Sequence, residues 1–162
     1  MPRITILFIL FLLPVLAGCG FYSFSQAGQS DIKSIAIERI ENQTDQLELG
    51  DKITDLVIDA FMSDGTMKVA STETADAILT ATFTGYSWQP FKYDENDVVE
   101  SYVVRMTFQV TLKKAGEEAD IFNETLSQEG FYQVGSGTEE EAQQDALALL
   151  IDAIIGKTTK GW

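Results

Sequence analysis

The sequence predicts an α+β fold, a two-layer sandwich with two helices packed on one face of a mostly antiparallel sheet of about four strands. Segments 76–88 and 101–113 alternate apolar and polar side chains, which is typical of strands with one buried face. Segments 49–61 and 142–154 repeat apolar residues every three or four positions, which predicts two amphipathic helices. A sheet and two helices that are each apolar on one side bury those sides against one another.

The first half of the predicted domain contains a strand, a helix and a short second strand. The strand is expected over 32–40, and the polar residues 41–45 are typical of a turn. The helix over 49–61 is expected to stop before Gly65, because glycine adopts the left-handed conformation that ends many helices. A short strand at 67–69 follows.

The second half contains the long strands 76–88 and 101–113 and a further strand from about 121 to 134. The connection 89–100 contains a proline and several acidic residues, which predicts an exposed hairpin loop. In the first strand, the alternation groups Tyr86 and Trp88 with the polar set. The sheet face turned away from the helices is expected to present Thr80, Thr82, Thr84, Arg105, Thr107, Gln109 and Thr111.

The last helix has a recognisable beginning and end. Thr138 and Glu141 have the spacing of a capping box, in which each side chain bonds the other residue's backbone N–H. Gly156 is expected to mark the end of the helix. Its predicted buried stripe is Ala142, Ala146, Leu149, Leu150, Ala153 and Ile154.

The amino terminus has the layout of an export signal. Arg3 supplies positive charge, the apolar run 4–13 follows, and small residues lead to a cleavage point. The run is shorter than the roughly 20 apolar residues that cross a bilayer as a helix. The segment 16–19, Leu-Ala-Gly-Cys, resembles the lipobox of bacterial lipoproteins, so Cys19 is the expected lipid attachment site; the alternative is an ordinary secretory signal with an incidental cysteine.

This interpretation divides the chain into three parts. Residues 1–18 are expected to be a lipoprotein signal peptide, 19–30 a lipidated tether, and 31–162 one α+β domain. Gly20 stands where an inner-membrane lipoprotein often has aspartate, which favours the outer membrane. The domain would then be held at the membrane by the lipid alone.

The composition argues against several classes of function. The chain has 11 basic and 25 acidic side chains and a net charge of −14, which disfavours nucleic acid as a partner. This charge suits solubility or docking on a basic partner surface. The chain has no histidine, and Asp94, Asn96 and Asp97 do not follow the spacing of a calcium-binding EF-hand loop. We therefore expect no enzyme activity, metal or cofactor.

Several short motifs along the chain resemble those of the lipopolysaccharide-assembly lipoprotein family, LptE. The resemblance implies a two-helix, four-stranded lipoprotein that inserts as a plug into the outer-membrane β-barrel LptD. It implies support of barrel assembly and of lipopolysaccharide transport to the cell surface, by binding alone. The residues that carry it are Gly18 to Tyr22, Ile32 to Ile37, Glu41 to Thr44, Ala75 to Leu79, Tyr86, Tyr93-Asp94 and Tyr102.

The resemblance also suggests binding residues near the hairpin. Family members contact lipopolysaccharide through basic residues there, and Lys92 and Arg105 are the candidates in this sequence, although the adjoining loop is acidic. Trp88, Phe91 and Tyr93 are candidate partner anchors, because aromatic clusters often mark interfaces. The alternatives are an ordinary loop lysine for Lys92 and an internal hydrophobic clasp for the aromatic residues.

A second resemblance, limited to the first half of the domain, leaves another function open. Residues 35–65 also resemble the opening of the curli secretion lipoprotein CsgG and of penicillin-binding-protein activators. Such a protein would serve a different envelope assembly, as a component of a secretion pore or as a regulator of a cell-wall synthase. The long hairpin that follows fits the LptE family better.

Overall fold

The structure is a computed structural model, and it describes residues 32–159. The predicted signal peptide, the tether and Cys19 lie outside the described residues. Neither helix in the described part of the chain is both long and apolar enough to cross a bilayer. The elements are β1 (Ser34–Ile37), β2 (Glu41–Asn42), α2 (Leu49–Asp64), β3 (Lys68–Val69), β4 (Ala77–Tyr93), β5 (Val99–Lys114), β6 (Asp120–Gln133) and α3 (Glu139–Thr159).

The α+β fold with two helices is confirmed, but the sheet is larger than predicted. It has six strands in the order β3-β1-β4-β5-β6, with β2 paired to β4 as well. The long strands β4, β5 and β6 are antiparallel, whereas β1 is parallel to β3 and β4, and β2 is parallel to β4. The prediction of about four mostly antiparallel strands was therefore wrong, because β2 is too short to show a period and the pairing direction of β1 is not visible within one strand.

The first half of the domain differs from the prediction mainly at β2. Residues 41 and 42, expected in a turn, pair with Thr82 and Phe83 of β4. Helix α2 confirms its prediction, since Gly65 has φ 67° and its N–H donates to the carbonyl of Phe61. Parallel pairing of β1 with β3 requires a crossover connection, and α2 supplies it.

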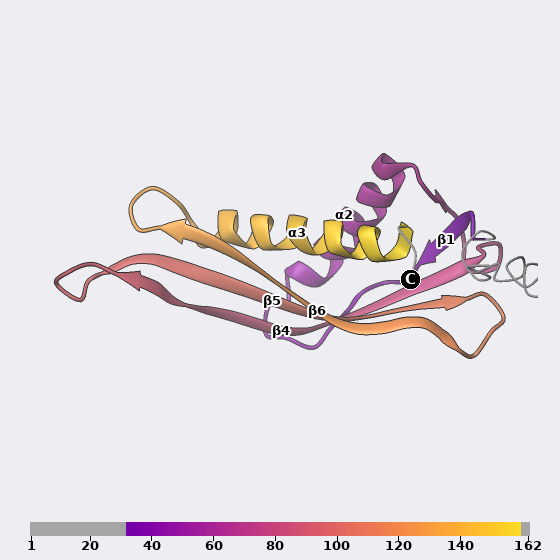
Figure 1. Cartoon of the computed structure of the whole chain (residues 1–162), viewed down its shortest axis with the longest axis horizontal. Helices are drawn as coiled ribbons and strands as arrows, with labels where there is room; N and C mark the ends of the chain where they lie inside the picture. Colours follow the sequence, from indigo (N-terminus) through magenta and orange to yellow (C-terminus); the bar gives the residue numbers. More distant parts are fainter. Residues whose placement is uncertain (1–31, 160–162) are drawn as a thin grey trace, which may run out of the picture. The chain divides into compact units, whose positions relative to one another are not determined.

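The β4–β5 hairpin is longer than predicted. The strands continue to Tyr93 and resume at Val99, so the predicted loop 89–100 shrinks to residues 94–98. Pro90 is tolerated because β4 has no neighbour other than β5 at this end of the sheet. The hairpin end projects past the first turn of α3 (Figure 1).

A β-bulge in β4 changes which side chains face the helices. The register runs from Phe83 opposite Phe108 to Gly85 opposite Thr107, which leaves one extra residue, Thr84, in β4. One extra residue reverses the alternation, so Tyr86 lies opposite the buried Met106 on the helix side. Trp88 follows on the same side, and grouping these two aromatic residues with the polar face was wrong.

Helix α3 begins as predicted and ends later. Thr138 and Glu141 each accept a hydrogen bond from the other's backbone N–H, at 3.2 and 3.0 Å, which confirms the capping box. The helix continues through Gly156 to Thr159, and the buried Thr158 hydroxyl donates to the carbonyl of Ile154 at 2.7 Å. Gly156 is thus an interior helix residue.

The buried side of α3 is rotated from the predicted stripe. Leu149 is half exposed, whereas Leu147 and Ile151 are buried together with the predicted Leu150 and Ile154. Nearly every residue from 146 to 155 is apolar, so the sequence period does not choose one side of the helix. Packing against the sheet determines which side of α3 is buried.

The helix lies close to the sheet at two points. A Cβ built on Gly130 of β6 would lie 1.8 Å from the carbonyl oxygen of Ala142, so only glycine permits this approach. Beside it, the Tyr86 hydroxyl donates to the Glu139 carboxylate and accepts a hydrogen bond from the Gln143 amide. Burial, followed by the bond to Glu139, raises the pKa of Tyr86 to about 12.

The carboxylate of Asp76, next to β4, adds side-chain hydrogen bonds to the start of β1. Asp76 accepts hydrogen bonds from the backbone N–H groups of Lys33 and Ser34, both at 2.9 Å, and from the Ser34 hydroxyl at 2.8 Å. The bond from Ser34, then those from the backbone, lowers the pKa of Asp76 below its usual 3.8.

We expect Asp76→Asn to destabilise the domain at neutral pH and much less in acid. A carboxyl whose folded pKa is lowered stabilises the protein above the unfolded pKa of 3.8, and this contribution is lost as the pH falls through the lower folded value. Urea unfolding of the wild type and the variant at about pH 7 and about pH 3 measures the difference. An equal difference at both values would contradict this role.

Candidate partner-binding surface

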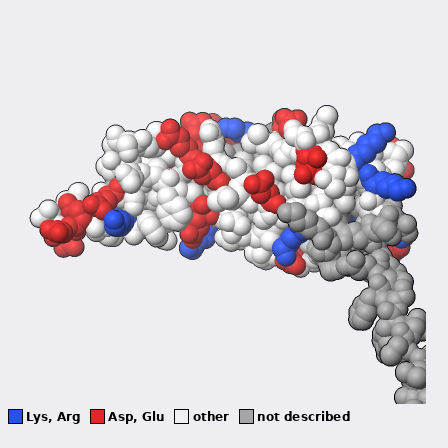
Figure 2. Space-filling view, turned by 45° about the horizontal axis from the view of Figure 1, so that its top comes forward, with Lys and Arg blue, Asp and Glu red and all other residues white. Residues whose placement is uncertain are grey.

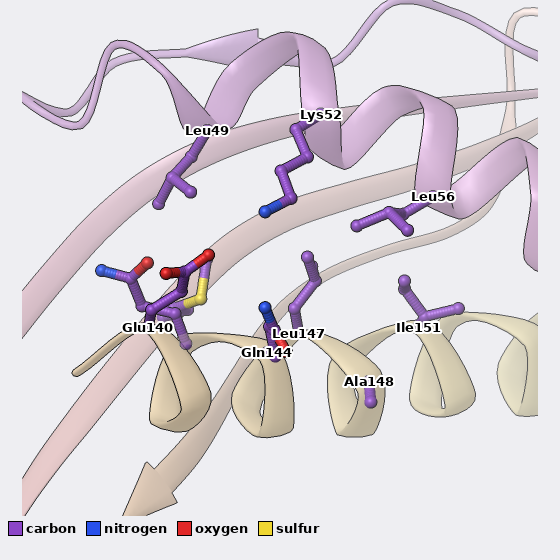
Figure 3. Close-up of a pocket in the computed structure, with 10 residues that line it drawn as sticks. Leu49, Lys52, Leu56, Glu140, Gln144, Leu147, Ala148 and Ile151 are labelled. Carbon is purple, nitrogen blue, oxygen red and sulfur yellow. The ribbon is translucent and has the colours of Figure 1, made fainter. Parts of the chain in front are cut away.

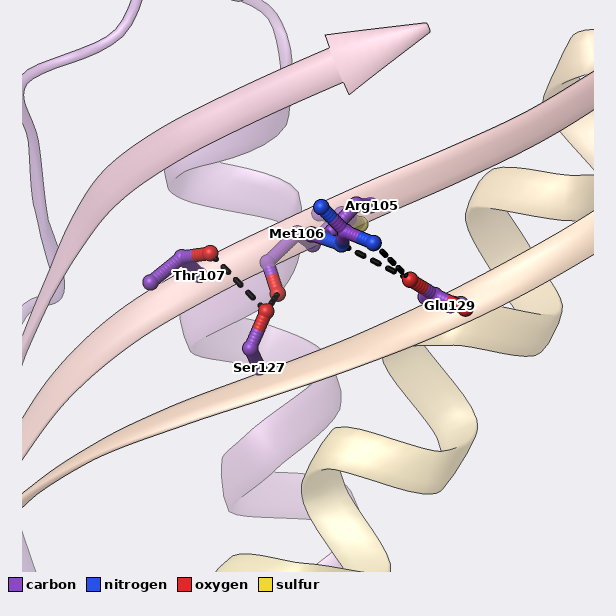
Figure 4. Close-up of polar contacts among 5 residues, drawn as sticks. All are labelled: Arg105, Met106, Thr107, Ser127 and Glu129. Carbon is purple, nitrogen blue, oxygen red and sulfur yellow. Dashed lines mark hydrogen bonds and ion pairs between the residues drawn. The ribbon is translucent and has the colours of Figure 1, made fainter. Parts of the chain in front are cut away.

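The sheet face turned away from the helices is polar, and its side chains bond one another. The Thr107 and Ser127 hydroxyls lie 3.0 Å apart (Figure 4). The Thr125 hydroxyl donates to Gln109 at 2.6 Å. We call this surface the polar face. The register assigns to it Thr80, Thr82, Thr107, Gln109, Thr111, Asn123, Thr125 and Ser127.

Along β4, β5 and β6 the middle of the polar face carries hydroxyl and amide groups, and charged pairs flank it. Arg105 donates through Nε to the Glu129 carboxylate at 2.7 Å, and Lys113 lies 3.3 Å from Asp120 (Figure 4 for the first pair). Each of these charges is matched by its opposite on the neighbouring strand. These two charged pairs can therefore lie against a polar wall or ordered water with their charges matched.

Three stacked aromatic side chains lie on the helix side of the sheet near the hairpin end. We call Trp88, Tyr102 and Tyr132 the aromatic ladder. The rings of Trp88 and Tyr102 stack with centroids 4.6 Å apart, and those of Tyr102 and Tyr132 stack at 5.4 Å. The Trp88 indole N–H also donates to the Tyr132 hydroxyl at 3.0 Å. Trp88 is thus engaged within the domain, as in the clasp interpretation, and still leaves 47% of its surface exposed.

The opposite side of the hairpin end holds a second aromatic pair. Phe91 meets Phe131 edge to face, with ring centroids 4.7 Å apart. Phe131 lies opposite Val103, which is buried, whereas the two phenyl rings are 59% and 45% exposed. We call Phe91, Val103 and Phe131 the aromatic patch. Sequence reasoning named Phe91 and missed Phe131, whose only signal was its place beside Tyr132 in a strand.

The hairpin tip is acidic and internally bonded. Asp94 accepts hydrogen bonds from the N–H groups of Asn96 and Val98, both at 2.8 Å, which lowers its pKa. Asp97 adopts a positive φ of 60°, as a tight turn requires. Asp94 thus shapes the turn, and residues 32–159 contain no group of side chains that could hold a metal ion. Figure 2 shows the carboxylates gathered at this tip.

The two basic candidates lie apart on the hairpin, and each has a carboxylate partner. Lys92 lies opposite Ser101 and its amine is 3.4 Å from Glu100, while Arg105 is bonded to Glu129. Arg105 is four positions after Ser101 along β5, which corresponds to about 13 Å. Tyr93, the third aromatic candidate, is 52% exposed next to the tip.

Comparison of the sequence with protein families finds one that covers the domain. The model of the lipopolysaccharide-assembly family LptE matches residues 32–157. No curated protein matches the sequence. The match includes β1 through most of α3, and with them both sides of the hairpin.

Solved structures with the same fold come from several bacteria. The hypothetical protein CT253 from Chlamydia trachomatis has a TM-score of 0.60 at 10% identity, covering 80% of this chain and 99% of its own. The uncharacterized lipoprotein B from Nitrosomonas europaea has a TM-score of 0.56 at 13% identity, covering 79% and 83%. PelC from Paraburkholderia phytofirmans, a dodecamer, has a TM-score of 0.50 at 15% identity, covering 79% and 89%. At these identities the likeness concerns the fold.

Proposed function

The chain belongs to the lipopolysaccharide-assembly family LptE, and on this premise we propose that it is an outer-membrane lipoprotein that binds and plugs the β-barrel LptD. In this role it supports assembly of the barrel and transport of lipopolysaccharide to the cell surface. The observation that carries the proposal is the family match across residues 32–157. The role consists of binding, with no bond made or broken.

The polar face supports this proposal on physical grounds. The interior of a large outer-membrane barrel is polar and hydrated. A protein that enters it must offer hydrogen-bonding groups without carrying unmatched charge into a confined space. The hydroxyls and amides of the polar face bond one another, as between Thr107 and Ser127, and can exchange these bonds for bonds to the barrel wall.

The aromatic patch provides the anchoring part of the interface. Phe91 and Phe131 remain about half exposed although they lie over the buried Val103. Exposed aromatic residues held by their neighbours are typical centres of binding energy, because little side-chain freedom is lost on docking. We rank them above Trp88, which is occupied in the ladder, and we retain Tyr93, which is 52% exposed next to the hairpin tip.

Contact with lipopolysaccharide remains part of the proposal, through Lys92 and Arg105. A phosphate approaching either residue has to compete with the carboxylate of Glu100 or Glu129. Lys92, whose pair is the more exposed, is the easier of the two to release. The lipid on Cys19 would keep the domain beside the membrane in which the barrel lies.

Affinity purification of the tagged lipoprotein from crosslinked outer membranes tests the proposal. We expect recovery of a large β-barrel protein, and a fall in surface lipopolysaccharide when the lipoprotein is depleted. Replacing Cys19 by alanine should release the protein from the membrane fraction. Recovery of a ring of this chain alone, or of a cell-wall synthase, would contradict the proposal and favour the alternative envelope assemblies.

A further inference from the structure

A groove separates the two helices on the outer surface of the domain. Its volume is about 330 Å³, and side chains of α2 and α3 form its two walls (Figure 3). Met106 of β5 lies at its base. The residues that line it are Leu49, Lys52, Leu56, Met106, Glu140, Gln143, Gln144, Leu147, Ala148 and Ile151.

The walls of the groove are apolar although they face outward. Leu56 of α2 is 38% exposed and points across toward Leu147 and Ile151 of α3, which are buried at the bottom (Figure 3). Ala148 is exposed on the α3 side and leaves the groove open, since its side chain is a single methyl group. The groove could therefore take one or two apolar side chains of a partner.

The groove lining itself holds one carboxylate, Glu140, and one amine, Lys52, and an acidic rim lies around it on the two helices. Helix α2 has four acidic residues and α3 has five, against one lysine in each. Asp55 and Asp59 are exposed next to Leu56 on α2. On α3, Glu140 and Ala148 are eight residues apart and therefore lie on the same side of the helix. Lys157 is paired with Glu124, which leaves Lys52 as the basic side chain at the groove. Figure 2 shows red side chains scattered across the face that carries both helices.

This combination of charge and apolar surface defines the occupant. We propose that the α2–α3 groove binds a basic amphipathic segment of a partner protein, whose apolar side chains enter the groove and whose lysines or arginines meet the acidic rim. Helical segments are commonly recognised in this way, with anchors three and four residues apart. The site lies on the helix layer, separate from the polar face and the aromatic patch, and its existence does not depend on the proposed function.

The same charges argue against a fatty acid or another anionic amphiphile in the groove. Its head group would have Lys52 as its one basic contact while lying within reach of Glu140, which is also in the lining. Repulsion by the rim carboxylates disfavours such a ligand at low ionic strength. The same carboxylates attract a cationic peptide and so favour its binding.

A fluorescein-labelled helical peptide of leucine and lysine is the probe, with leucines three and four residues apart. We expect it to bind the purified full-length lipoprotein in fluorescence-anisotropy titrations, with affinity that falls as salt is added. The same peptide with glutamate in place of lysine should bind far more weakly. The substitution Ala148→Trp, which fills the groove from an exposed helical position, should weaken binding by about tenfold or more.

Matched variants separate the groove from general effects. Leu149→Trp adds the same side chain one residue away, at a half-exposed position outside the lining, and should leave binding unchanged. Glu140→Lys should weaken binding about three- to tenfold, more than Glu118→Lys, which changes the net charge equally in the β5–β6 turn. Circular dichroism confirms that each variant is folded.

Three results would overturn the proposal. The first is equal binding of the glutamate peptide, and the second is wild-type affinity in the Ala148→Trp variant. The third is a different occupant, shown by displacement of the peptide by laurate or by a dimer of the domain that Ala148→Trp abolishes in sedimentation. Since these measurements involve no barrel, they fail or succeed independently of the plug proposal.

Discussion

The substitution Gly130→Ala should destabilise the domain by about 3 kcal/mol, the largest stability effect we expect from a single methyl group. The new Cβ would lie 1.8 Å from the backbone carbonyl oxygen of Ala142, so a side-chain rotation cannot relieve the clash. Helix α3 would have to move away from β6 as a unit. That movement would strain the bonds of Tyr86 with Glu139 and Gln143 in the same region.

The matched control is Gly156→Ala in the same helix. A Cβ at position 156 meets nothing within 4 Å, and alanine favours the helical conformation over glycine by about 1 kcal/mol. This variant should therefore be more stable than the wild type. Urea unfolding followed by circular dichroism compares the midpoints. A Gly130→Ala midpoint equal to the wild type would show that α3 and β6 are not in the contact described.

Replacing the aromatic patch with charge should remove most of the binding to the proposed barrel partner. We expect Phe131→Glu to reduce recovery of the barrel at least tenfold, and Phe91→Glu to have a similar effect, because each replaces an exposed apolar anchor with a group that must be desolvated. The measurement is quantitative copurification of the two proteins from outer membranes. Surface lipopolysaccharide should fall in the same order as recovery.

The matched control for these variants is Met62→Glu. Met62 is 65% exposed on α2, away from the hairpin, so it tests the effect of the same charge on a different surface. The phenylalanine variants should keep their folded circular dichroism signal, since both rings are already about half exposed. Full recovery of the barrel with both phenylalanines replaced would exclude the aromatic patch as an anchor.

Residues with a strong local signal were predicted best. The capping box at Thr138 and Glu141 and the stop at Gly65 depend on bonds within a few residues of the chain, and both are present. The two-residue strand β2 has no such signal, because it exists only through its pairing with β4. The same holds for Gly156, where burial of Thr158 and its neighbours carries the helix past a residue that often ends one.

The candidate site shows the same division. Phe91 could be selected from the sequence because it lies among other aromatic residues near a hairpin, but its partner Phe131 is distant in the sequence. Lys92 and Arg105 were selected for their charge, and only the strand register reveals their separation and their pairing with Glu100 and Glu129.

The sequence alone determined the α+β class, both helices, the three long strands and the resemblance to the LptE family, because periodicity and local motifs are properties of neighbouring residues. Only the tertiary structure decided the mixed six-stranded pairing, the side on which Tyr86 and Trp88 lie, and the groove between the helices. One extra residue at the Thr84 bulge reverses the facing of the β4 side chains from Gly85 to Pro90. Such a shift is set by hydrogen bonding to β5, which a pattern within one strand does not contain.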